Sequence, residues 1–183
     1  MSDIKSAWEI AQEKASRLGE LSPEEREEKR REKFYLAGET LADKYLSQHN
    51  IEIIRDELGK YDVRDRDLVA SAAVRHLAGA IDLQYPDALV AISIGIIALK
   101  ESVELRETLD KIKSLSLEFL EAEEKERQDI QRAGDQIIHQ LRISGSAIGG
   151  LNIHARKDWQ EKLDQTIKPF NDRLRSLKQE LQV

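Results

Sequence analysis

The sequence contains no cysteine among its 183 residues. The protein therefore has no disulfide, no thiolate nucleophile, no iron–sulfur cluster and no zinc site with cysteine ligands. The absence of cysteine suits the reducing environment of the cytoplasm, and we expect a cytoplasmic protein.

Long apolar runs and a basic surface are missing as well. The longest uncharged run in the apolar middle of the chain, 88–99, has 12 residues, whereas a membrane-spanning helix needs ~18–20. The first residues show no basic segment followed by an apolar one, so a secretory signal is not expected. The formal net charge of −6 argues against a general nucleic-acid-binding protein, which usually has a basic face. We expect neither membrane insertion nor nucleic-acid binding.

Proline (3 residues) and aromatic residues (5%) are scarce, whereas charged residues reach 35% of the chain, above the usual ~25%. The chain is rich in alanine, leucine, isoleucine, glutamate, lysine and arginine. This composition is typical of long amphipathic helices. We predict an all-α protein, a helical bundle with a long C-terminal antiparallel coiled-coil hairpin.

Residues 1–60 are predicted to form charged N-terminal helices. Apolar residues at helical spacing indicate a first helix over 2–18. A second helix is predicted to start at Ser22, which can cap it, while Glu25 completes a capping box. Acids and bases balance over 24–33, and this balance favours a solvated helix with internal ion pairs over a nucleic-acid site.

A short helix over 51–58 leads to the apolar central part of the chain, 61–102. Helical spacing predicts helices over 64–83 and 87–142. We place the break between them at Pro86, because proline is well tolerated only at a helix start.

The segment 88–99 is apolar on all sides, so it must be buried in the core or lie in a subunit interface. The charged N-terminal helices offer little apolar surface to cover it. A homo-oligomer, most simply a dimer, would provide the cover. The candidate interface residues are Leu89, Ile92, Ile96 and Leu99.

Residues 103–183 are predicted to form a helical hairpin with a glycine-rich tip. The apolar face of its first helix is interrupted at Glu126. The second helix carries an apolar series over about three heptads, as in a coiled coil. That series keeps its phase across Pro169, where we expect a kink or a new helix start. It consists of Trp159, Leu163, Ile167, Phe170, Leu174, Leu177 and Leu181.

No pattern in the sequence indicates a catalytic residue, a metal site or a cofactor site. None of the four histidines follows a glutamate by three residues, the spacing of di-metal sites in helical bundles. Gly145 and Gly149 lack the Gly-Lys-Ser/Thr ending of a phosphate-binding loop. We expect no cofactor and no metal.

Two functions remain open from the sequence. The favoured one is a non-enzymatic scaffold or adaptor that contacts an unidentified protein partner through its helices. The alternative is a small-molecule sensor or a small helical enzyme with a polar pocket around the central helices, where Arg75 and His76 are candidates. His76 also fits a histidine at the edge of the core that is hydrogen-bonded to a neighbour.

The glycine-rich tip is the predicted partner-binding site, because exposed apolar residues with a charged rim commonly mark interaction surfaces. The same tip can equally fold over the end of the hairpin or onto a second subunit. Its residues are Arg142, Ile143, Gly145, Ile148, Gly149, Gly150, Leu151, Ile153, Arg156 and Lys157.

Overall fold

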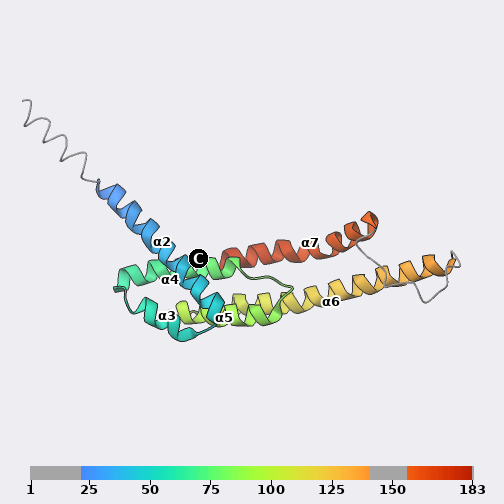
Figure 1. Ribbon diagram of the computed structural model, residues 1–183, viewed down its shortest axis with the longest axis horizontal. Helices are drawn as coiled ribbons and strands as arrows, with labels where there is room; N and C mark the ends of the chain where they lie inside the picture. Colours follow the sequence, from blue (N-terminus) through green and yellow to red (C-terminus); the bar gives the residue numbers. More distant parts are fainter. Residues whose placement is uncertain (1–21, 141–155, 183) are drawn as a thin grey trace, which may run out of the picture.

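The computed structural model describes residues 22–140 and 156–182 (Figure 1). This part of the chain contains six helices and no strand, which confirms the prediction of an all-α helical bundle. The predicted helix over 2–18 and the glycine-rich segment 144–150 lie outside the described residues. The helices are α2 (Pro23–Gln48), α3 (Ile51–Leu58), α4 (Val63–Gly79), α5 (Pro86–Leu99), α6 (Val103–Gln140) and α7 (Lys157–Glu180).

The first described helix, α2, begins where the sequence predicts. The backbone N–H of Glu25 donates to the Ser22 hydroxyl at 3.1 Å, and the Glu25 carboxylate accepts the Ser22 N–H at 2.7 Å. Two N–H groups that no helical carbonyl can reach are thereby satisfied. In the same way Asn50 caps α3, its side-chain oxygen accepting the Glu52 N–H at 3.0 Å. Both helix starts are thus set by local side-chain chemistry.

The prediction of one continuous helix over 87–142 is wrong, because the chain leaves the helical conformation between α5 and α6. Lys100 is extended, with φ −147° and ψ 107°. The hydroxyl of Ser102 then accepts the Leu105 N–H at 3.2 Å and caps α6. The break lets α6 turn back and pack against α5.

Helix α4 ends at Gly79, four residues before the predicted end at 83. The next residues form a loop that remains part of the core, since Ile81 and Leu83 are buried. The carbonyl of Leu83 accepts a hydrogen bond from the buried Ser116 hydroxyl of α6 at 2.8 Å. The buried side chains and this hydrogen bond hold the loop in place, although it is not helical.

Helices α2 and α4 cross at very close range. A Cβ atom placed on Gly38 would lie 2.5 Å from the Val69 carbonyl oxygen and 2.6 Å from the Ala72 Cβ. Only glycine fits at this point of the crossing. The contact brings the buried face of α2 against the alanine-rich face of α4, and the two helices share the central core.

Helix α5 is buried on one face only, although its sequence is apolar on all sides. Val90 (49% exposed) and Ile94 (45%) lie one turn apart on its solvent side. The apolar side chains of α5 are therefore divided between the core and the surface of the chain.

In the described ranges, no helix is both long and apolar enough to cross a membrane.

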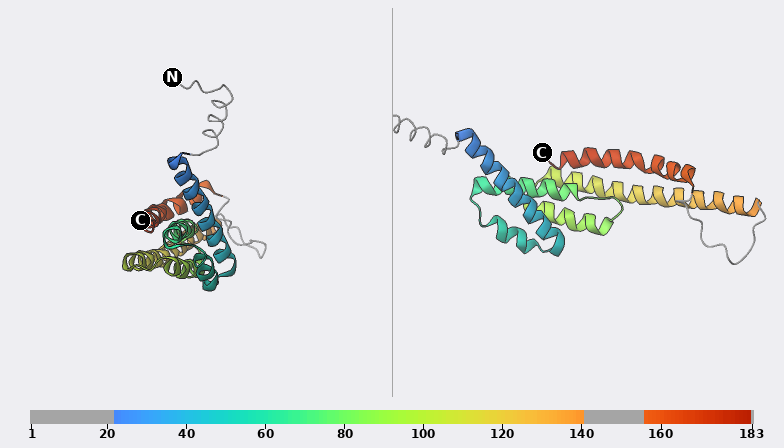
Figure 2. Two further views of the ribbon diagram at one scale, coloured as in Figure 1. Left: turned by 90° about the vertical axis from the view of Figure 1, so that its left-hand side faces the viewer. Right: turned by 45° about the horizontal axis from the view of Figure 1, so that its top comes forward.

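Helix α7 runs back along α6, as Figures 1 and 2 show. Polar pairs between the helices link position 108 to 180, 118 to 173 and 126 to 166, so the two helices are antiparallel. Pro169 lies inside α7, which continues through it from Lys157 to Glu180. The coiled-coil packing expected for this pair stays a prediction.

Candidate functional site

The described structure has a compact part and a two-helix arm. The last α6 residues in the shared core are Phe119, which is buried, and Leu120, which packs against it. Beyond that point α6 and α7 continue together away from the other helices (Figures 1 and 2). We call residues 121–140 and 157–166 the arm.

The arm is held together by few apolar contacts. Ile130 and Leu163 are its buried large apolar side chains, at 2% and 8% exposure, and neither belongs to the shared core. Between them and the core, the Thr166 hydroxyl donates to the Glu126 carboxylate at 3.3 Å. This bond accounts for the acidic interruption that the sequence shows at Glu126, since a polar partner faces it from α7.

Many of the arm's acids are paired along its own surface. The Arg127 guanidinium donates to Glu123 at 2.8 Å, and Arg132 pairs with Asp129. Such exposed pairs within one helix add little stability, typically a few tenths of a kcal/mol. These pairs make the surface of the arm charged and solvated, and they do not form a catalytic or ligand-binding site.

Two residues of the predicted tip fall within the described part of the chain. Arg156 precedes α7, and its guanidinium donates to both Asp158 carboxylate oxygens, at 3.0 and 2.6 Å. This pairing raises the pKa of Arg156 and lowers the pKa of Asp158. The guanidinium also lies 4.7 Å from the centre of the Trp159 ring. Lys157 is exposed at the first position of α7.

The other tip residues lie outside the described residues. They are Arg142, Ile143, Gly145, Ile148, Gly149, Gly150, Leu151 and Ile153.

The four residues predicted for an oligomer interface are used inside the single chain. Leu89, Ile92, Ile96 and Leu99 are all buried, with Ile96 fully inaccessible. They belong to the shared core, the first of the two environments that the sequence left open for them. An interface formed through α5 therefore has to use its other face, where Val90 is exposed.

The candidate pocket residues Arg75 and His76 are engaged with their neighbours. His76 Nε2 lies 2.8 Å from the Asp43 carboxylate of α2, and its Nδ1 lies 4.0 Å from Glu39. Arg75 lies over the ring of Tyr35 at 6.0 Å from its centre. His76 is thus the core-edge histidine with a hydrogen-bonded neighbour, the simpler of its two interpretations.

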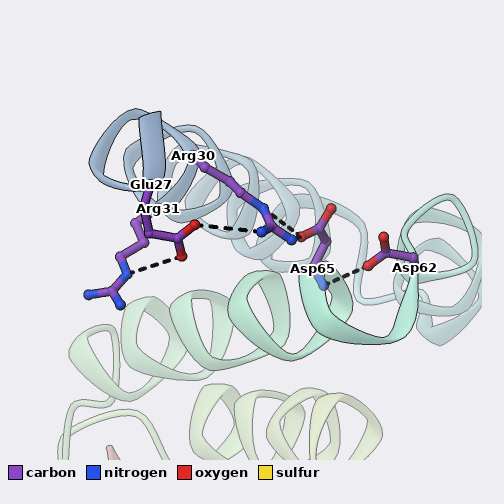
Figure 3. Close-up of polar contacts among 5 residues, drawn as sticks. All are labelled: Glu27, Arg30, Arg31, Asp62 and Asp65. Carbon is purple, nitrogen blue, oxygen red and sulfur yellow. Dashed lines mark hydrogen bonds and ion pairs between the residues drawn. The ribbon is translucent and has the colours of Figure 1, made fainter. Parts of the chain in front are cut away.

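One arginine of the charged run 24–33 has a structural role that the sequence pattern did not reveal. Arg30 reaches from α2 to α4, where its Nε donates to the Asp65 carboxylate at 3.1 Å (Figure 3). The backbone N–H of Asp65 in turn donates to the carboxylate of Asp62, the residue that caps α4, at 3.0 Å. The Asp65 carboxylate raises the pKa of Arg30. The contact spans 35 positions, so no local spacing signals it.

The described residues contain no group of three or more histidine, aspartate or glutamate side chains arranged to hold a metal ion. The chain matches no protein-family model, no curated protein and no solved structure.

Proposed function

We propose that the protein is a non-enzymatic helical scaffold or adaptor that binds a partner protein through the end of its arm. The observation that carries this proposal is the continuation of α6 and α7 beyond the core. Helix α6 has 38 residues, or about 57 Å at ~1.5 Å per residue, and its core contacts end at Phe119 and Leu120.

The arm covers none of the apolar side chains of the shared core, so its length is not needed to bury them. Ordering a residue costs roughly 1–2 kcal/mol of backbone entropy, and the arm recovers this through α6–α7 packing alone. An element with so few buried apolar side chains adds little to global stability. Its extension supports a role in contact with another molecule.

Because α6 and α7 are antiparallel, their outer ends lie at the same end of the molecule, with α6 reaching beyond the start of α7 (Figure 1). We propose that they pack there as a coiled coil and present the tip residues, from Arg142 to Lys157, to the partner. Ile137, at 36% exposure, adds an apolar side chain close to this end of α6. Apolar residues beside basic ones suit a partner surface that is apolar with an acidic rim.

We also propose that the protein self-associates, most simply as a homodimer, through the exposed face of α5. Val90 and Ile94 supply the apolar centre of that face. Replacing both by aspartate places charges on an exposed surface, so folding should persist while the dimer dissociates. Light scattering checks this, and a wild-type monomer at micromolar concentration contradicts the self-association proposal.

The function is tested with the full chain as bait in a cytosolic extract, the compartment that the cysteine-free sequence favours. Captured proteins are identified by mass spectrometry and tested again as purified components. The double variant Ile148→Ser with Leu151→Ser should lose the partner and keep the melting temperature. The control is Leu36→Ser with Val63→Ser, which changes two exposed apolar residues away from the arm and should retain the partner.

Two results contradict the proposal. The first is that no captured protein binds again in purified form. The second is that the tip variant unfolds more easily by ~2 kcal/mol or more, because loss of that size means that its apolar residues are buried contacts of the fold.

A further inference from the structure

A cavity of about 240 Å³ lies between α2, α3 and α4, and the proposed interaction makes no use of it. Its apolar lining comes from Ala37 and Leu41 of α2 and Val69 of α4. Leu41 and Val69 are buried core residues, so this wall is rigidly supported from behind. The cavity is therefore a built feature of the helix packing.

The charged groups that line the cavity, Lys44 and Glu57, form an ion pair. The Glu57 carboxylate of α3 accepts hydrogen bonds from Lys44 of α2 at 3.1 Å and pairs with Lys60 at 3.0 Å. These two ammonium groups, Lys60 first, hold the pKa of Glu57 below its usual value. Glu57 is thus neutralised by two ammonium groups, of which that of Lys44 lines the cavity and that of Lys60 does not.

Tyr61 lines the cavity beside Lys44 and Glu57. Its ring is held edge-on against Phe34, with centroids 5.8 Å apart and planes at 86°. Within the described residues the Tyr61 hydroxyl makes no hydrogen bond, and the Lys44 ammonium uses one of its three donors on Glu57. Donors on two of the lining side chains thus remain available.

We propose that this cavity binds a small organic carboxylate with a short branched apolar body. The carboxylate accepts hydrogen bonds from Lys44 and Tyr61, and the apolar body lies against Ala37, Leu41 and Val69. A few polar groups that fix orientation beside an apolar wall are the usual composition of a small-molecule site. An amine of the same shape would meet the Lys44 ammonium beside Glu57, a carboxylate that two lysines already neutralise, so the site favours an anion.

The probe for this site is isovalerate, compared with 3-methylbutan-1-ol and 3-methylbutan-1-amine, which have the same body with a neutral and a cationic head. Calorimetric titration and thermal shift of the full chain should show saturable binding of isovalerate alone. Lys44→Met keeps the side-chain stem and removes the charge, and it should weaken binding by about tenfold or more. Lys60→Met is the matched control, because it removes the other partner of Glu57 without changing the cavity lining, and it should stay within about threefold of wild type.

Tyr61→Phe is the second variant, and it removes a hydroxyl that makes no hydrogen bond within the described residues, so the fold should be unaffected. It should weaken isovalerate binding by about fivefold. The proposal is overturned if isovalerate does not bind, if the alcohol or the amine binds as tightly, or if Lys60→Met weakens binding as much as Lys44→Met. Should Lys44→Met fail to fold, Tyr61→Phe decides the matter, and unchanged affinity in that variant overturns the proposal.

Discussion

The ring of Tyr45 occupies the space into which any side chain at Gly95 would extend. A Cβ atom at Gly95 would lie 2.3 Å from Cε1 of Tyr45, and the Tyr45 hydroxyl donates to the Ala91 carbonyl at 2.6 Å. Tyr45 belongs to α2 and Gly95 to α5, so this contact joins helices that are distant in the sequence. It decides which face of α5 is turned toward the core.

Gly95→Ala should destabilise the protein by about 1–3 kcal/mol, because the added methyl group must displace a buried aromatic ring. Gly79→Ala is the matched control, since a Cβ at that position meets no atom within 4 Å. Its stability should be unchanged or slightly raised, as alanine favours helix more than glycine does. Urea denaturation of both variants measures the difference. Equal stabilities would show that the Tyr45 ring yields without cost.

Stability should fall at alkaline pH in a way that depends on Tyr45. Burial raises the pKa of this hydroxyl, whereas tyrosine in the unfolded chain has a pKa of about 10. The contribution of Tyr45 is therefore fully present below the unfolded pKa, and it is lost as the pH rises toward the folded pKa.

Denaturation curves across this alkaline range should be less pH-dependent for Tyr45→Phe than for wild type. The control is Tyr85→Phe, which changes an exposed tyrosine and should follow the wild-type profile. A Tyr45→Phe profile parallel to that of wild type would mean that the hydroxyl is not protected in the folded state.

Arg30→Met should lower the thermal midpoint, because it removes the ion pair between the N-terminal half of α2 and Asp65 of α4. The difference from wild type should shrink at high salt, which screens an accessible pair. Arg31→Met is the control, since Arg31 pairs with Glu27 on its own helix. Differential scanning calorimetry at two salt concentrations compares the variants. Equal midpoints for Arg30→Met and Arg31→Met would contradict a bridging role for Arg30.

The arm should open independently of the compact part. Ile130→Ala removes apolar contacts that the shared core does not use, so hydrogen exchange should accelerate over 121–140 and stay unchanged around Leu109. Mass spectrometry of peptides from α6 measures both regions in one experiment. Faster exchange over all of α6 would show that the arm and the core unfold as one unit.

Helix starts could be predicted because their chemistry is local. The Ser22–Glu25 capping box and the Asn50 cap each involve residues two or three positions apart. The break at Ser102 was missed although its cap is equally local, since the apolar pattern continues across it and outweighed a single serine. The Arg30–Asp65 pair and the Lys44–Glu57 pair were missed because their members are 35 and 13 positions apart.

The helical class of this protein, the starts of α2 and α3, and the amphipathic faces of α6 and α7 are all encoded locally in the sequence. These properties follow from composition, caps and periodic apolar residues, which act within a few residues along the chain. Which side of α5 is buried depends instead on its packing against the other helices. A segment that is apolar on every side carries no periodic signal, so the choice was made by the fit of Gly95 against Tyr45. That same packing places Val90 and Ile94 at the surface, and the packing of α2 and α3 on α4 forms the cavity beside Lys44, which is open to solvent.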